Sequence, residues 1–398
     1  MQNINRKLAG IYTKVGSDST LKILIFGLGS VGNYLLDYLM AWPEKNIELH
    51  VCVRSPEKAT PDINILKVSN LIRYQQIKPV IVHNVDLNDT DSITAIFKVV
   101  SPDFIVNSSR VYSGLKYGSI SWSNIRAYGL WSPLSIKFIR NIMKAYKSSG
   151  CNGIVINTSY SDVVNNWLKS AGLSYPDFGS GNINHLIPRI KMAVAEQIGI
   201  SDCKDIEVTL ATSHFHDVVI SKEGHTEGID PLLNLRYLGK ELSLDMNAVY
   251  KKCAIPMPVD AKRNMMNASS NFEIIAKIIN AARVHSQQVI HTPGVAGFIG
   301  GYPVRIDFRT GTPEAQHCTF IEDFFSLHEM QKHNRSSIAL DGIEDVSNGV
   351  LSYTDKLCEK VEKSFGVVIP KHVPFNKIEE TADFLIDKII KPKITNAK

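Results

Sequence analysis

Three glycines near the N-terminus have the spacing of a loop that binds phosphate groups. Gly27, Gly29 and Gly32 form a G-x-G-x-x-G pattern after an apolar run at residues 21–26 and before a helix-like segment at residues 33–42. In that context the first glycine permits a tight turn, the second lets a ligand approach the backbone, and the third lets the helix pack on the sheet. The free N–H groups at the start of the helix would bind the phosphates. A dinucleotide is therefore predicted on the loop formed by Gly27, Leu28, Gly29, Ser30, Val31 and Gly32.

The end of the next strand-like run, at residues 47–53, indicates which dinucleotide is preferred. An Asp or Glu at this place binds the ribose 2′-hydroxyl of NAD, whereas this sequence has Arg54, Ser55 and nearby Lys58. A cation suits a 2′-phosphate, so we predict NADP(H) as the preferred cofactor, with NAD(H) as the alternative. In this interpretation Arg54 pairs with the phosphate, and the competing interpretation is an ordinary solvated arginine.

Polar residues follow two further strand-like runs. Asp86 comes after the run at residues 80–82, and Asn107 and Ser108 come after the run at residues 104–106. We predict that Asp86 contacts the adenine end of the cofactor and that Asn107 and Ser108 lie near the nicotinamide ribose. A turn or capping role for Asp86 is an equal alternative.

Two histidines follow a strand-like run at residues 206–211 in the second half of the chain. Hydride transfer to a carbonyl needs a proton donor near the oxygen, and histidine titrates close to neutral pH. We predict His214 as this acid and base, with Asp217 as the carboxylate that holds its imidazole. For His216 a structural role is an even alternative.

The same residues could also be read as metal ligands. His214, His216, His225 and Asp217 lie close together, and an H-x-H pair on a strand directs both imidazoles to one face. Neither a cysteine nor a carboxylate at tight spacing strengthens this reading. We therefore predict a site without metal.

The elements that must position these residues alternate between strands and helices. Strand-like runs at 21–26, 47–53, 80–82, 104–106 and 154–156 are separated by helix-like stretches, a pattern that predicts a parallel sheet covered on both faces. After residue 158 longer helices predominate. We predict an α/β protein with an N-terminal extension at 1–20, a doubly wound Rossmann domain at 21–158 and a mixed α/β substrate domain at 159–398.

Composition sets limits on the class of protein. The chain has 398 residues, 44% of them hydrophobic, and a net charge of +5 that forms no dense basic stripe. Six scattered cysteines read as reduced thiols, and neither a signal peptide nor an apolar run long enough to span a membrane is evident. We predict a cytoplasmic protein that binds neither nucleic acid nor membrane.

From residue 154 onward, the order of motifs resembles the lactate/malate dehydrogenase superfamily. The similar segments are the strand and turn at 154–164, the Gly-Ser-Gly turn and helix at 179–200, the strand and histidine motif at 208–217, and a closing strand and turn at 337–346. The resemblance implies a catalytic histidine at His214. It also implies that Arg110 belongs to a loop that closes over the substrate and that Asn157 contacts the nicotinamide end or the substrate.

The sequence departs from this superfamily where the substrate would bind. Asn184 or His185 stands in place of the aspartate that orients the histidine, and Ile187 or Pro188 in place of the arginine that grips the substrate carboxylate. Arg189 comes one or two positions late. The second arginine of the mobile loop has at best Lys116 near its place. Simple lactate or malate chemistry is therefore not expected.

These observations predict an NAD(P)-dependent oxidoreductase that acts on a hydroxyl or keto group of a small polar substrate. We expect a homo-oligomer, a dimer or a tetramer. One alternative is an epimerase, lyase or glycosidase-like enzyme that retains its cofactor, and another is an NADP(H)-binding protein that has lost catalysis.

Overall fold

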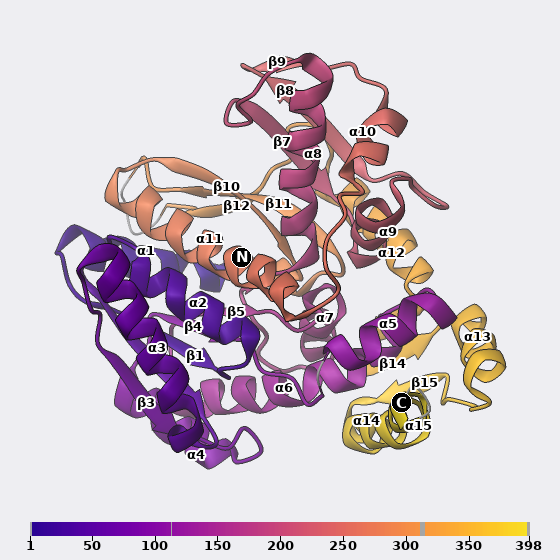
Figure 1. The fold of residues 1–398 in the computed structure, drawn as a ribbon, viewed down its shortest axis with the longest axis horizontal. Coiled ribbons are helices and arrows are strands. Elements are labelled where there is room, and N and C mark those ends of the chain that lie inside the picture. Colours follow the sequence, from indigo (N-terminus) through magenta and orange to yellow (C-terminus); the bar gives the residue numbers. More distant parts are fainter. Residues whose placement is uncertain (1, 113, 311–314, 396–398) are drawn as a thin grey trace.

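A six-stranded parallel sheet forms the centre of the N-terminal half in the computed structural model, which describes residues 2–112, 114–310 and 315–395 (Figure 1). The strand order is β3-β2-β1-β4-β5-β6, with Ile23 opposite Leu49 on one side and Phe104 on the other. This order is that of the Rossmann fold. The strands are β1 Leu21–Phe26, β2 Ile47–Val53, β3 Val80–Asn84, β4 Phe104–Asn107, β5 Ile154–Asn157 and β6 Phe178–Gly179.

Helices cover both faces of the sheet because alternate strand residues point to opposite sides. Leu24 and Phe26 pack with the helices of one face, whereas Ile23 and Ile25 pack with those of the other. The first face is covered by α4 Thr90–Val100, α6 Ser132–Ser149 and α7 Ser161–Ser170. The second is covered by α1 Gln2–Gly16, α2 Ser30–Ala41, α3 Pro56–Tyr74 and α11 Asn264–Arg283.

The segment expected to be an N-terminal extension is a packed helix, α1. Ile4, Leu8, Ile11 and Val15 recur at helical spacing and are buried against the sheet domain. Lys7 forms a buried ion pair of 2.6 Å with Asp177 at the entry to β6. No helix signal is evident in the sequence of residues 1–20 because polar residues between these four positions mask their periodicity.

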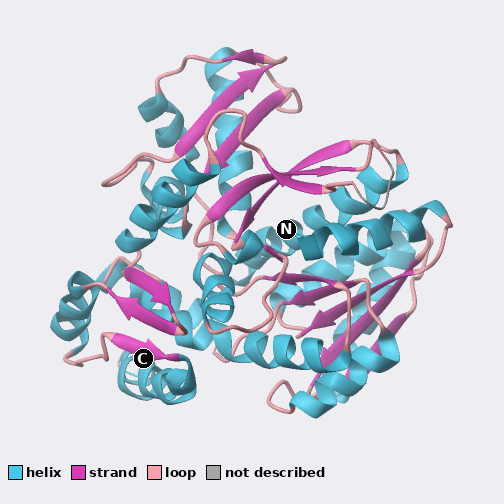
Figure 2. Cartoon of the chain, turned by 180° about the vertical axis from the view of Figure 1, so that it is seen from behind, coloured by secondary structure: helices cyan, strands magenta, loops and turns pink. Residues whose placement is uncertain are grey.

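The second half of the chain contributes smaller antiparallel sheets and more helices (Figure 2). The strands are β7 Ile206–Ala211, β8 Leu232–Tyr237, β9 Lys240–Glu241, β10 Gln287–Pro293, β11 Gly301–Asp307, β12 Cys318–Phe320, β13 Ile343–Ser347, β14 Val350–Tyr353 and β15 His372–Pro374. The longer helices beyond the sheet domain are α8 Asn182–Ile198, α9 His214–Glu223, α10 Met246–Cys253, α12 Leu327–Leu340, α13 Asp355–Phe365 and α14 Ile378–Leu385. Helix α5 Gly114–Asn124 and the short helices η1 Gly129–Trp131 and η2 Ala261–Arg263 border the region where the two halves meet. Short helical segments also occur at η3 Val295–Gly297, η4 Phe375–Lys377, η5 Ile386–Ile390 and α15 Lys391–Thr395.

The two halves are more interwoven than a boundary at residue 158 implies. Strand β6 follows that boundary yet pairs with β5 in the Rossmann sheet. Helix α11 packs on α1 and α2, and α14 packs on α6. In the described residues, no helix combines the length and apolar composition that crossing a bilayer would require.

Candidate active site

The glycine loop lies between β1 and α2 at the carboxyl edge of the sheet. Gly27 has φ +90°, a left-handed conformation that favours glycine. A Cβ on Gly32 would lie 2.2 Å from the carbonyl oxygen of Gly27, so the helix can approach the turn this closely because residue 32 lacks a side chain. A Cβ on Gly29 would meet open space, and this residue caps α2 without a side-chain hydrogen bond. The first N–H groups of α2 are therefore accessible to an anionic ligand.

A cavity of about 760 Å³ runs from this loop to the second half of the chain. Its walls come from the carboxyl ends of the parallel strands, from α5, and from helices α8, α9 and α11. This size matches sites that enclose a cofactor or small molecule. Among the predicted site residues, the cavity lining includes Gly27, Leu28, Gly29, Ser30, Val31, Arg54, Ser108, Arg110 and His214.

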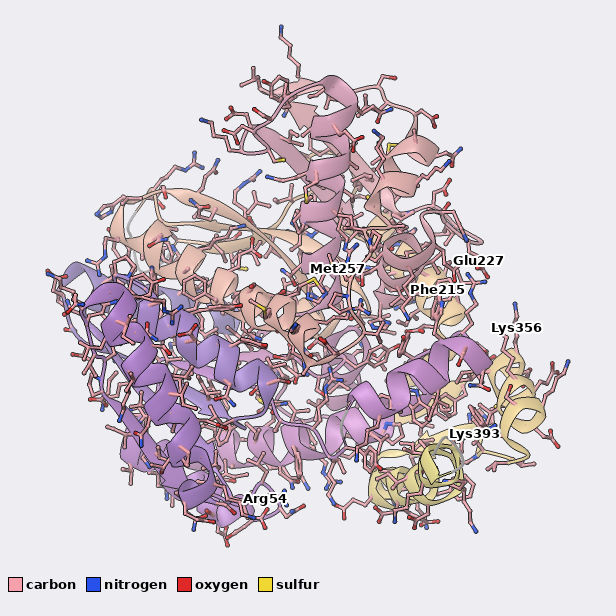
Figure 3. The ribbon with its side chains drawn as sticks, viewed as in Figure 1. Arg54, Phe215, Glu227, Met257, Lys356 and Lys393 are labelled. Carbon is pink, nitrogen blue, oxygen red and sulfur yellow. The ribbon has the colours of Figure 1, made fainter. Side chains whose placement is uncertain are left out.

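Arg54 lies at the end of β2, at the outer edge of the Rossmann domain and away from Phe215 and Met257 (Figure 3). It also lines a second hollow of about 570 Å³, together with Ser55 and Lys58. Arg54 and Lys58 are exposed, and neither forms a salt bridge within the described part of the chain. These two cations and the carboxylate of Asp62 thus line a hollow beside Leu28 of the glycine loop.

The two asparagines predicted to contact the cofactor are buried and do not reach the cavity wall. Asn107 donates a hydrogen bond of 2.9 Å to Asn157, and both side chains are inaccessible and absent from the cavity wall. Asn157 also binds the backbone of Ser159. These hydrogen bonds occupy the polar groups of Asn107 and Asn157 within the protein. The two side chains therefore link β4 to β5.

Asp86 is exposed and likewise lies outside the cavity wall. Its Oδ1 accepts hydrogen bonds of 2.9 Å from the backbone and the side chain of Asn88. This is the turn-stabilising arrangement that had been the alternative to an adenine contact. The neighbouring Val85 and Leu87 line the cavity in its place.

His214 is the first residue of α9 and lines the cavity. Its backbone N–H donates to Asp162, 3.0 Å away, and its ring Nδ1 lies 3.0 Å from Oδ2 of Asp341. The edges of Tyr128 and Tyr160 enclose the ring, with centroids 5.0 and 5.1 Å away. If Nδ1 carries the proton shared with Asp341, Nε2 is the nitrogen left for a ligand.

The carboxylate that orients His214 is Asp341, not Asp217 as predicted from the sequence. Asp341 is inaccessible and accepts hydrogen bonds from the Tyr160 hydroxyl at 2.6 Å and the Tyr128 N–H at 2.7 Å. It follows α12, whose last residues include part of the segment at 337–346 expected to be a strand. The sequence around residue 341 contained no chemical signal that it would meet a histidine more than a hundred positions earlier.

Burial and charge give the titratable groups around His214 unusual pKa values. Burial alone lowers the pKa of His214, but the nearby carboxylates, Asp341 foremost and then Asp162 and Asp217, together raise it above its ordinary value. Burial raises the pKa of Asp162 to about 6 and that of Asp217 to about 7, even though His214 acts in the opposite direction on both. Such perturbed groups beside a cavity are typical of functional sites.

His216 points away from this site. Its Nδ1 lies 2.6 Å from Oγ of Ser337 and its Nε2 lies 3.1 Å from the carbonyl oxygen of Glu227. The exposed His225 instead pairs with Glu223. In the described ranges, no group of three or more His, Cys, Asp or Glu side chains is positioned to hold a metal ion.

Residues 184–189 lie in the first turns of α8. Asn184 caps the start of α8 and donates to the carbonyl of His291. Burial lowers the pKa of His185 to about 3, so this imidazole is neutral at physiological pH. Arg189, although one or two positions late, reaches the cavity wall, and sequence reasoning had not assigned it a role.

Arg110 follows β4 in the chain and also lines the cavity. Its side chain is exposed, lines the cavity, and donates a long hydrogen bond of 3.5 Å to the carbonyl oxygen of Thr158. A Cβ on Gly114, at the start of α5, would lie 2.5 Å from this guanidinium. Arg110 therefore presents an exposed guanidinium to the cavity, close to the backbone of Gly114.

Comparison with known proteins adds evidence on the fold. Neither a protein-family profile nor a curated protein sequence matches this chain. Among solved structures, malate dehydrogenase from Cryptosporidium parvum is 13% identical with a TM-score of 0.52, and the match covers 81% of this chain and 98% of that one. Malate dehydrogenase from Plasmodium falciparum is 15% identical, with a TM-score of 0.51 and coverage of 87% and 99%. Lactate dehydrogenase from Eimeria maxima, solved with NADH and oxamate, is 14% identical, with a TM-score of 0.50 and coverage of 80% and 91%.

The chain has the lactate/malate dehydrogenase fold. The predicted class, a Rossmann sheet followed by a mixed α/β domain, is confirmed by these matches and by the strand order. In this chain the carboxylate beside His214 comes from the end of α12.

Proposed function

We propose that this chain is an NAD(P)-dependent oxidoreductase that transfers hydride to or from a hydroxyl or keto group of a small polar substrate. The observation that carries the proposal is that the glycine loop and His214, whose ring Nδ1 is held by the buried Asp341, line one cavity. The dehydrogenase fold of the chain agrees with this activity. A cytoplasmic location and a dimer or tetramer stay predictions.

The residues of the glycine loop fit a dinucleotide. The open space over Gly29 and the uncapped first turn of α2 can accept a pyrophosphate, and Ser108 lies beside Gly27, donating to its carbonyl at 2.8 Å. A bound nicotinamide would supply or accept the hydride.

His214 would handle the proton that accompanies the hydride. With Nδ1 held by Asp341, Nε2 can donate a proton to a carbonyl oxygen, or take one from a hydroxyl in the reverse direction. The buried Asp341 carboxylate stabilises the imidazolium form and fixes the orientation of the ring. Tyr128 and Tyr160 limit the access of water to this pair.

The test is a binding titration followed by a turnover screen. NADPH and NADH are titrated separately into the purified protein, and the oxidation of each is then followed with a panel of 2-oxo acids and larger keto acids. We expect micromolar or tighter binding of at least one cofactor and turnover with a member of the panel. Failure of both cofactors to bind would overturn the proposal.

We propose NADP(H) as the preferred cofactor because Arg54 and Lys58 line the second hollow and form no salt bridge among the described residues, although Asp62 lines the hollow as well. Replacing Arg54 by alanine is expected to weaken NADPH binding about tenfold and to leave NADH binding unchanged, since one exposed charge-assisted hydrogen bond to the phosphate is lost. Isothermal titration of both cofactors measures the change. The exposed Lys45→Ala variant is the control, and an unaltered ratio of NADPH to NADH affinity in R54A would refute the assignment.

A further inference from the structure

Asp217 is a buried carboxylate in the cavity wall whose role the reaction described above leaves open. It lies three residues after His214 on α9, so both side chains are on the same face of the helix and both line the cavity. Asp217 is 4% exposed. A group of the substrate that lies close to the reacting carbon would therefore meet this carboxylate.

The hydrogen bonding of Asp217 is incomplete for so buried a charge. Its Oδ1 accepts a long hydrogen bond of 3.3 Å from the hydroxyl of Ser221. Within the described residues Asp217 forms no salt bridge. A buried carboxylate is costly unless donors surround it. Burial accordingly raises the pKa of Asp217 to about 7, with His214 and Arg189 acting against this rise.

Arg189 would be the natural partner of Asp217, but other contacts hold it away. Its guanidinium donates to the carbonyl oxygen of Cys253 at 2.8 Å and to the sulfur of Met257 at 3.0 Å. Met257 lies near the lower end of α8 (Figure 3). Arg189 is 4% exposed, lines the cavity, and leaves its Nε without a partner in the described part of the chain. A carboxylate and a guanidinium, each short of partners, thus border the same space.

We propose that Asp217 is a specificity-determining residue that accepts a hydrogen bond from a hydroxyl or ammonium group carried by the substrate near its reacting carbon. The substrate class is then a hydroxy or keto compound with a second donor group near its reacting carbon, and not one with a plain alkyl chain. An alkyl group at this place would leave the carboxylate buried and unpaired. The inference rests on the proposed function, because it assumes that the reaction takes place at His214.

Three probes that differ in one group test the proposal: lactate, with a methyl group, glycerate, with a hydroxymethyl group, and 3-amino-2-hydroxypropanoate, with an aminomethyl group. Their affinities for the NADP⁺-loaded protein are measured by calorimetry above the pKa of Asp217, where the carboxylate is ionised. We expect glycerate or the amino compound to bind at least about tenfold more tightly than lactate, as one hydrogen bond to a charged group implies.

Two variants distinguish the donor. Asp217→Leu should abolish the preference altogether, whereas Asp217→Asn should abolish it for an ammonium group and retain part of it for a hydroxyl group, because an amide oxygen still accepts. Asp217→Asn is nearly isosteric and tests the idea even if the leucine variant does not fold. The exposed Asp202→Asn variant is the matched control and should retain the full preference.

Three results would each overturn the subsite. The three probes bind equally, none of them binds, or the preference survives in both variants. The proposed oxidoreductase function is tested separately, by turnover. A preference that depends on Asp217, without NADPH formation from any probe and without NADPH consumption by any keto acid, would support the subsite and count against the oxidoreductase activity. Turnover without a preference would do the reverse.

Discussion

Replacing His214 by asparagine is expected to lower kcat by about 10²- to 10⁴-fold, the range contributed by a positioned general acid or base. His214 lines the cavity with its Nδ1 held by Asp341, so its other ring nitrogen is the proton donor nearest the substrate in this account. Asparagine cannot exchange that proton. Steady-state kinetics with the best keto acid and NADPH measures the loss.

Cofactor binding separates this effect from a general loss of structure. The glycine loop is built from other elements, so H214N should bind NADPH with unchanged affinity. His225→Asn serves as the control because His225 is exposed and lies outside the cavity wall. Undiminished turnover in H214N would rule out the assigned role.

Replacing Asp341 by asparagine is expected to reduce kcat by about 10²-fold or more, since an amide does not stabilise the imidazolium and can select the wrong tautomer. The carboxylate accepts hydrogen bonds from Tyr160 and Tyr128 in addition to its contact with His214. An amide can retain part of these contacts, so the fold should persist. The exposed Asp345→Asn variant is the control for kinetics and for thermal unfolding.

The pH profile of D341N gives a sharper test of this pair. Asp341 raises the pKa of His214 against the effect of burial. Reduction of a carbonyl needs the protonated imidazole. The value of kcat/KM for reduction is therefore at its maximum below the pKa of His214 and falls as the pH rises through this pKa. Without the carboxylate, burial lowers the pKa, and the fall should move to lower pH in D341N. An unmoved limb would show that Asp341 does not act on His214.

The position and shape of the glycine loop could be predicted from the sequence because their signal is local. Gly27, Gly29 and Gly32 lie at the junction of a buried strand and a helix. The turn and the close approach that call for glycine there involve residues only a few positions away. Arg54 could be placed for the same reason, since the end of β2 is fixed relative to this loop. Local pattern and local geometry agree here.

The environment of His214 could not be predicted in this way. Its orienting carboxylate comes from residue 341, which reaches the ring because α12 packs beside α9. Asp217 was the nearer choice in sequence, yet the helical spacing of α9 directs it into the cavity instead. Asn107 and Asn157 follow strands as cofactor-binding residues do, but they face each other across β4 and β5. Contacts distant in sequence decided each of these cases.

The most direct test of the central claim is transfer of a labelled hydride. NADPH that carries deuterium at both hydrogen positions of the nicotinamide C4 is incubated with the protein and the keto acid that turns over fastest, and the product is analysed by mass spectrometry. The account predicts one deuterium on the new carbinol carbon with the wild-type protein and almost none with H214N. Binding of NADPH without label transfer to any keto acid in the panel would contradict it.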